Sequence, residues 1–190
     1  VDERGATSRD ATIDALVSSG HTVLAMDVRG TGDLAPAAGA SGYSAAYQFA
    51  ARAWLLGTSV VAWQAQDIHA GLALLRAEAP SAARRVVQAS GQTVPAALIA
   101  AQHDRPDALI LEEGLVSYLD LATADTHDQT TLSVLPGVLR VTDLPELMAR
   151  LAPTPVRVVR PRGADSAPLT TAQVAARAGR ALPANVTVEP

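Results

Sequence analysis

Apolar residues along this chain fall into two patterns. Some form short continuous runs, which are typical of strands buried on both faces of a parallel sheet, and others recur on one face of longer stretches, which is typical of amphipathic helices. Their alternation predicts an α/β fold, a three-layer sandwich with a mostly parallel sheet and helices on both faces. The expected strands are residues 22–26, 85–89, 108–112, 156–159 and 186–189.

Residues that start or stop helices bound the amphipathic stretches. Gly20 ends the first, Gly57 separates the second from the third, and Pro80 stops the third. The Gly-, Ala- and Pro-rich segment 28–42 is predicted to be a loop. The expected helices cover residues 9–19, 43–56, 59–79, 93–102, 144–151 and 170–181.

Length and composition limit the classes of protein to consider. The chain has 190 residues, of which 48% are hydrophobic, and no internal boundary, so a single domain over residues 1–190 is expected. No uncharged apolar run is long enough to span a membrane and no signal-peptide pattern is visible, so no membrane partner is predicted. The lack of cysteine excludes disulfides, thiolate catalysis and cysteine-ligated metal, and leaves the compartment open.

The charge pattern argues against nucleic acid as a partner. The net charge is −4, and the fifteen basic residues are all arginines scattered along the chain. Aromatic residues make up only 3% of the sequence. A nucleic-acid-binding surface needs clustered positive charge for phosphates and rings for base stacking.

The most informative segment, residues 84–101, is predicted to form a strand, a sharp turn and a helix. A serine-hydrolase elbow places its nucleophile on such a turn, with small residues two positions before and two positions after it. Around Ser90 these positions hold Gln88 and Gln92. Alignment on the helix instead puts Gly91, which has no side chain, at the nucleophile position.

Three interpretations of this turn stay open. In the first, Ser90 is the nucleophile, for which it is the only local candidate. In the second, the Ser90 hydroxyl caps the helix that begins near Gln92. In the third, the turn binds an anion or a carbonyl oxygen without attacking it, which makes Gly91 and Gln92 candidate oxyanion- or ligand-binding residues.

Several other strings, taken in order, resemble the α/β-hydrolase superfamily, specifically its acetyl xylan esterase and prolyl-oligopeptidase-like branch. Their order and spacing extend over nearly the whole chain. The strings are Gly20–Gly32 (GHTVLAMDVRGTG), Trp54–Gly57 with Asp67, Ala97–Ala101, Leu111–Tyr118, Leu135–Leu139 with Asp143–Pro145, and Leu151–Val156.

This resemblance implies a carboxylic-ester hydrolase that acts through an acyl-enzyme on a small-molecule or carbohydrate ester, without cofactor or metal. It also implies a fragment: the family's early strands would precede Val1, and its catalytic histidine would follow Pro190. Such a fragment is expected to pack against the missing N-terminal part or a partner domain, or to associate through an unpaired sheet edge. Family members are often exported, which bears on this chain only by analogy.

The resemblance also gives roles to polar residues. Asp165, in the loop 163–169, matches the acid-bearing loop of the family and would orient the catalytic base. The alternative is an exposed turn aspartate. Asp27 and Arg29 would tie the loop after the strand 22–26 to neighbouring turns.

Other candidate chemistry is weaker. Gly30-Thr31-Gly32 lacks the third glycine and the following helix of a dinucleotide-binding fingerprint. Glu112 and Glu113 are adjacent on a predicted strand, so their side chains are expected to point to opposite faces and not to act on one substrate atom. A flavodoxin-like or receiver-like domain fits the alternation of elements but needs an acidic cluster or a phosphate loop that this sequence lacks.

None of the four histidines has a clear functional pattern. His21 is expected at the start of a strand, His69 on a helix surface, and His103 at a helix C-terminus, where a cation interacts favourably with the helix dipole. His127 has acidic neighbours, but one histidine among aspartates is typical of a hydrophilic loop rather than a metal site.

Two hypotheses about function follow. The first is an esterase with Ser90 as nucleophile, Asp165 as orienting acid and a base beyond Pro190. The second is a catalytically silent hydrolase-fold module that binds a carbohydrate ester or packs against a partner domain, and the degenerate turn at Gly91 favours it.

Overall fold

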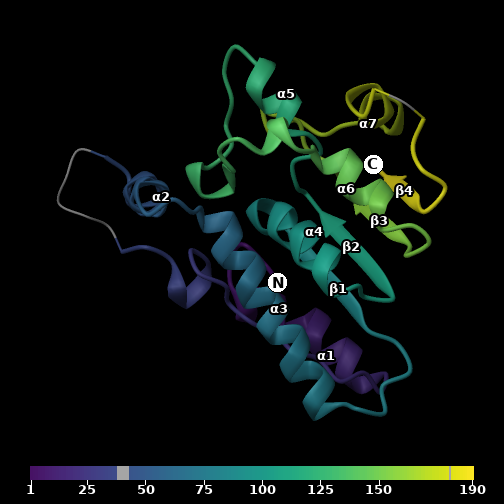
Figure 1. Cartoon of the computed structure of the whole chain (residues 1–190). Helices are drawn as coiled ribbons and strands as arrows, with labels where there is room; N and C mark the ends of the chain where they lie inside the picture. Colours follow the sequence, from purple (N-terminus) through teal and green to yellow (C-terminus); the bar gives the residue numbers. More distant parts are fainter. Residues whose placement is uncertain (38–42, 180) are drawn as a thin grey trace.

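A four-stranded parallel sheet runs through the protein (Figure 1) and confirms the predicted α/β class. The structure is a computed structural model that describes residues 1–37, 43–179 and 181–190. The strands lie side by side in chain order, and each neighbouring pair is parallel. Their bounds are β1 Val86–Ser90, β2 Ala108–Glu112, β3 Val156–Val159 and β4 Val186–Glu189.

Helices cover both faces of the sheet, so the fold has three layers. Helix α4 packs against β1 and is flanked by α3 and α6. Helix α7 lies against β4 (Figure 1). No helix in the described ranges is long and apolar enough to cross a membrane. The helices are α1 Asp10–Ser18, α2 Ala45–Leu55, α3 Val60–Glu78, α4 Val94–His103, α5 Tyr118–Thr123, α6 Leu144–Arg150 and α7 Thr171–Arg177.

Capping side chains explain where several helices begin. Ser59 accepts a hydrogen bond from the N–H of Ala62 at the start of α3. At the start of α6, Asp143 and Glu146 form a capping box in which each side chain binds the other's backbone N–H. The helix α5 is not predicted by the sequence pattern, and α7 is shorter than predicted. The predicted loop 28–42 lies partly outside the described residues, at positions 38–42.

The core lies between α4 and the sheet. Leu98 of α4, Leu109 of β2 and Val156 of β3 have no exposed surface. Burial of one such side chain contributes about 2 kcal/mol relative to exposure. This packing fixes the carboxyl ends of β1, β2 and β3, where the candidate site residues lie.

The apolar run 22–26 is not a strand, so this prediction is wrong. None of its backbone groups bonds to a strand in the described part of the chain, and the sheet ends at β1. Leu24 and Met26 lie instead against Gly71 of α3. An extended apolar segment becomes a strand only when a neighbouring backbone pairs with it, and here no paired backbone is next to it.

Val1 lies at the outer edge of β1. Its nitrogen donates to the carbonyl oxygen of Gln88 at 2.6 Å, and its own carbonyl accepts from the N–H of Ser90 at 3.2 Å. This is the hydrogen-bond pattern of two parallel strands. The first residues therefore pass the carboxyl end of β1, beside Ser90.

The loop after residues 22–26 is tied down as expected. Asp27 accepts hydrogen bonds from the N–H groups of Ala6 at 2.6 Å and Asp33 at 2.9 Å. The guanidinium of Arg29 forms an ion pair with Asp67 of α3, with a shortest distance of 2.7 Å. Asp27 therefore ties the loop to the turn of residues 2–6 as predicted, whereas Arg29 ties it to helix α3 rather than to a turn.

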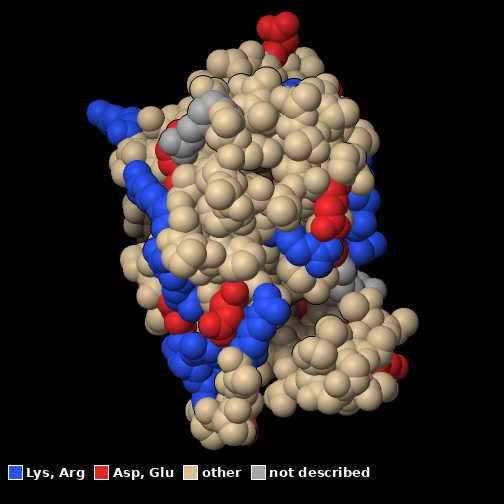
Figure 2. All heavy atoms as spheres, turned by 90° about the vertical axis from the view of Figure 1, so that its right-hand side faces the viewer, with Lys and Arg blue, Asp and Glu red and all other residues tan. Residues whose placement is uncertain are grey.

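Charged side chains are unevenly distributed on the face seen in Figure 2. Arginines run down one side of it, with acidic side chains among them at the lower end. Ion pairs join Arg157 of β3 to Glu189 of β4 at 2.8 Å, and Arg76 of α3 to Asp104 at 2.5 Å. The first pair is exposed, so solvent screens it strongly, whereas the Asp104 side chain of the second pair is mostly buried.

Candidate functional site

The turn between β1 and α4 lies at the carboxyl edge of the sheet. β1 ends at Ser90, a short 3-10 helix covers Gly91–Thr93, and α4 begins at Val94. Gly91 has a φ of +54°, which glycine adopts without steric strain. Ligands of open parallel sheets bind at this edge, so the turn lies where a site is expected.

Ser90 is buried, and no histidine of the described residues bonds to its hydroxyl. Its side chain accepts a long hydrogen bond, 3.4 Å, from the backbone N–H of Glu3. It makes no capping bond to the following helix, so the interpretation of Ser90 as a side-chain cap is wrong. No imidazole in the described ranges hydrogen-bonds to the hydroxyl, and a serine without a base is a weak nucleophile.

A carboxylate covers the top of the turn. The N–H of Gln92 donates to Oε2 of Glu3 at 2.9 Å. A Cβ atom at Gly91 would fall on the same carboxylate. The side chain of Gln92 turns away and donates from Nε2 to the carbonyl oxygen of Gly30 at 3.3 Å. The turn therefore holds a carboxylate oxygen on a backbone amide, in the space that a side chain at position 91 would need.

A second group of charged residues follows β2 and β3. Nε of Arg160 donates to Oε1 of Glu113 at 2.8 Å, and Nη2 of Arg160 lies 3.9 Å from Oε2 of Glu112. Both carboxylates thus reach one guanidinium, and the prediction that they point to opposite faces is wrong. β2 ends at Glu112, and Glu113 has a φ of +52°, which turns its side chain out of the strand alternation.

The arginines of this ion-pair group lower the pKa of one of its carboxyls. The hydrogen bond from Arg160 lowers the pKa of the Glu113 carboxyl, and the charges of Arg160 and Arg162 act in the same direction against partial desolvation. Glu112 also accepts a hydrogen bond from Nε2 of Gln88 at 3.0 Å, which links the group to β1. With two arginines and two glutamates, the group holds strand ends together, and the lowered pKa of Glu113 does not suit that carboxyl to act as a general acid.

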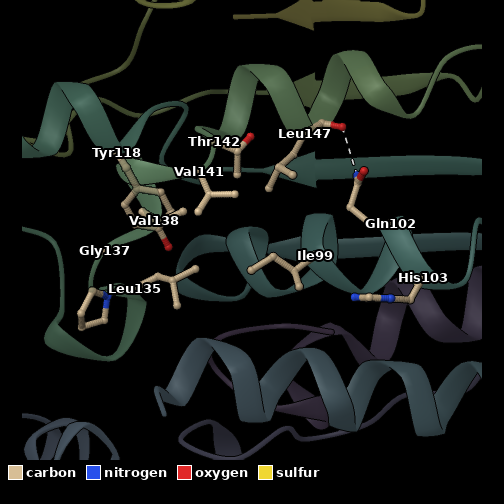
Figure 3. Close-up of a pocket in the computed structure, with 11 residues that line it drawn as sticks. Ile99, Gln102, His103, Tyr118, Leu135, Gly137, Val138, Val141, Thr142 and Leu147 are labelled. Carbon is tan, nitrogen blue, oxygen red and sulfur yellow. Dashed lines mark hydrogen bonds between the residues drawn. The ribbon is translucent and has the colours of Figure 1, made fainter. Parts of the chain in front are cut away.

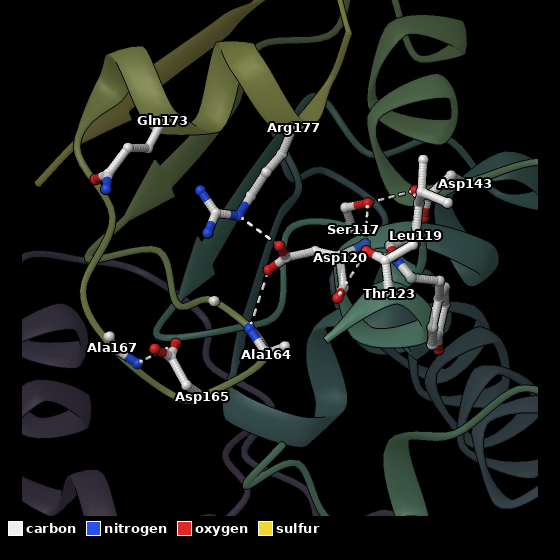
Figure 4. Close-up of polar contacts among 12 residues, drawn as sticks. Ser117, Leu119, Asp120, Thr123, Asp143, Ala164, Asp165, Ala167, Gln173 and Arg177 are labelled. Carbon is white, nitrogen blue, oxygen red and sulfur yellow. Dashed lines mark hydrogen bonds and ion pairs between the residues drawn. The ribbon is translucent and has the colours of Figure 1, made fainter. Parts of the chain in front are cut away.

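Asp165 lies in an exposed turn after β3 (Figure 4). Its only hydrogen bond among the described residues is from the N–H of Ala167, at 3.1 Å to Oδ1. Gly163 and Ser166 close the same turn through a backbone bond of 3.0 Å. The contacts are those of a turn aspartate, and Asp165 orients no histidine in the part of the chain that the structure describes.

The loop that carries Asp165 is held firmly by another aspartate. Oδ2 of Asp120 on α5 accepts from the N–H of Ala164 at 3.0 Å, and Oδ1 lies 2.9 Å from Nε of Arg177 on α7 (Figure 4). Asp128 donates its N–H to the carbonyl of Ala164 at 3.0 Å. The loop therefore has a fixed shape, although Asp165 itself faces solvent.

The histidines lie away from the turn. His21 bonds to Ser19 and to the carbonyl of Leu16 at the end of α1, and His69 lies 4.0 Å from Asp104. His103 is the last residue of α4, as predicted. His127 is exposed in the loop after α5. Among the described residues, no three His, Cys, Asp or Glu side chains are grouped so that they could hold a metal ion.

Glu3, Arg160 and Arg162 are the site residues that sequence reasoning missed. Glu3 meets Gln92 across 89 positions of the chain, and no local pattern signals such a contact. Arg160 directly follows β3 at the edge where ligands bind, which is the signal that could have indicated it.

Comparisons of this chain with protein-family models, with curated proteins and with solved structures find no match.

Proposed function

We propose that this chain is a catalytically silent module of α/β-hydrolase type, whose turn between β1 and α4 binds a carboxylate or carbonyl oxygen. The observation that carries the proposal is the occupation of this turn: the N–H of Gln92 already holds a carboxylate oxygen of Glu3, and Gly91 offers no nucleophile. The buried Ser90, without a base, supports the same conclusion.

The ligand class follows from the donor. A backbone N–H at the start of a helix stabilises a negative or partly negative oxygen, and the helix dipole adds to this attraction. Glu3 is exposed, and its carboxylate is carried on a flexible side chain. A ligand oxygen can therefore replace the carboxylate on the N–H of Gln92. An ester carbonyl or a free carboxylate has the required acceptor.

An ester hydrolase is the second candidate, and the chain order of the strands favours it. With β1, β2 and β3 parallel and adjacent, Ser90 and the loop of Asp165 follow strands at the same edge of the sheet. A base from outside the described residues would complete a triad in this alternative.

A fluorophosphonate probe distinguishes the two candidates. The 190-residue chain, shown to be folded by circular dichroism, is exposed to the probe and its intact mass is measured. The silent module predicts that neither the parent nor the Ser90→Ala variant gains the mass of the probe, while a known serine esterase is labelled in parallel. An adduct that maps to Ser90 and disappears in Ser90→Ala would establish the hydrolase instead.

The binding part of the proposal has a separate test. In Glu3→Ala, the amide proton of Gln92 loses its carboxylate partner, and added acetate should shift its NMR signal saturably. In the parent chain, Glu3 competes and the shift should be smaller. An acetate response that is absent in Glu3→Ala would contradict the proposed ligand class.

A further inference from the structure

A groove of about 390 Å³ lies between α4, α6 and the segment 135–142 (Figure 3). Its walls are mainly apolar, with Ile99 on α4, Leu147 on α6 and Val138 between them. None of Ser90, Gly91, Gln92 and Asp165 lines it, so it is separate from the candidate site described above. Its volume falls within the range of roughly 300–1,000 Å³ that is usual for small-molecule pockets.

Hydrogen bonds fix the two ends of this groove. At one end the hydroxyl of Tyr118 donates to the carbonyl oxygen of Ser133 at 2.7 Å, and Tyr118 is buried, with 4% of its surface exposed. At the other end Nε2 of Gln102 donates to the carbonyl of Leu147 at 3.1 Å, which joins α4 to α6 (Figure 3). The groove is therefore preformed rather than opened by a ligand.

Two polar groups without partners lie at the Gln102 end. Oε1 of Gln102 accepts no hydrogen bond within the described residues, and the imidazole of His103 makes none. Figure 3 shows both side chains at the end of the groove away from Tyr118, with Gln102 directed toward α6 and His103 on the other side of α4. The groove thus combines an apolar length with one acceptor and one ring that can donate or accept.

The charges at this end favour a neutral head group. Gln102 and His103 form the last turn of α4, where the helix dipole is negative, and Asp104 follows directly. A carboxylate placed there would meet the negative end of the dipole, while the charge of Asp104 is balanced by its ion pair with Arg76. A hydroxyl can donate to Oε1 of Gln102 without that repulsion.

We propose that this groove binds a neutral amphiphile, an alkyl or aryl chain with one terminal hydroxyl. The apolar part of this ligand lies against Ile99, Val138 and Leu147, and its hydroxyl donates to Oε1 of Gln102. Val141 lines the groove and is 78% exposed. The apolar part of the bound ligand would cover this surface.

The probe for this proposal is 4-phenyl-1-butanol, titrated into the isotope-labelled chain and followed by NMR. Saturable shifts are expected in the backbone amides of residues 99–103, 138–142 and 147. The acid of the same skeleton, 4-phenylbutyrate, should bind at least about tenfold more weakly at pH 8, a difference of 1.4 kcal/mol. Absence of saturable shifts in these residues, or equal affinity for the acid, would overturn the proposal.

Two exposed apolar residues give a matched pair of variants that keep the core intact. Val141→Asp puts a carboxylate on the groove wall and should weaken binding of the alcohol at least about tenfold. Leu139→Asp places the same charge on a neighbouring residue that does not line the groove, and should change the affinity less than about twofold. Equal effects of the two variants would show that the groove is not the binding site.

Discussion

Two apolar runs of five residues, 22–26 and 108–112, look alike in sequence and end differently in the structure. The second forms β2, paired on both sides by β1 and β3. The first has no ladder in the described residues and lies against α3. The difference shows that an apolar run encodes burial, whereas a strand requires a partner backbone that the run itself does not specify.

Amide hydrogen exchange should show the largest contrast between the two runs. The N–H of Leu109 is bonded to the carbonyl of Pro155 at 3.0 Å in the middle of the sheet, so it should exchange only on global unfolding, with a protection of about 5 kcal/mol or more. The amides of residues 23–25 should have less than about 2 kcal/mol of protection. Equal protection of the two runs would mean that residues 22–26 are paired in solution.

Shortening one leucine in each run tests the same contrast through packing. Leu109→Ala leaves a cavity at a fully buried position and should lower the free energy of unfolding by about 3 kcal/mol. Leu24→Ala removes a partly exposed side chain and should lower it by about 1 kcal/mol. Urea denaturation measures both values, and losses of equal size would contradict the comparison.

The aspartates that hold the chain after each run should also differ. Asp143 accepts from the hydroxyl of Ser117 and the N–H of Tyr118, each at 2.6 Å, and Asp143→Ala should destabilise the fold by about 2 kcal/mol because it leaves buried donors without partners. Asp27→Ala breaks the two contacts of the less buried loop, and about 1 kcal/mol is expected. Thermal unfolding of both variants beside the parent checks the order.

A smaller effect is expected from the carboxylate that follows β2. The hydrogen bond from Arg160 lowers the pKa of Glu113, so the charged form stabilises the fold above the ordinary carboxyl range, and this stabilisation is lost as the pH falls through the lowered value. Both side chains are partly exposed, so the contribution should stay below about 0.5 kcal/mol. Glu113→Gln should therefore unfold with a slightly weaker acid dependence than the parent, and an unchanged acid dependence would contradict this role.

Most of the sheet can be predicted from the sequence, because three of its strands are continuous apolar runs. Residues 108–112, 156–159 and 186–189 form strands with the predicted bounds, and β1 is shifted by one residue. The failure at 22–26 has a physical cause, since pairing depends on residues elsewhere in space. The helix α5 was missed because only six residues form it and the capping contacts of Ser117 depend on the distant Asp143.

The candidate site was less predictable than the fold. Alignment of the sequence on the helix 93–102 places Gly91 at the nucleophile position of the turn. The left-handed backbone of Gly91 agrees with this alignment. Glu3 could not be inferred, because it reaches the turn only through the path of residues 1–5 beside β1. The groove beside α4 likewise depends on how the segment 135–142 packs, and that segment has no regular hydrophobic period.

The Glu3 carboxylate and a side chain at position 91 cannot occupy the turn at the same time. Any side chain introduced at Gly91 would claim the volume that this carboxylate fills, and would also have to tolerate a left-handed backbone. Displacement of Glu3 would leave the N–H of Gln92 without its carboxylate acceptor. An attempt to give this turn a nucleophile therefore has to begin at the third residue of the chain, and a serine placed at 91 alone would compete with the protein's own acid for the same space.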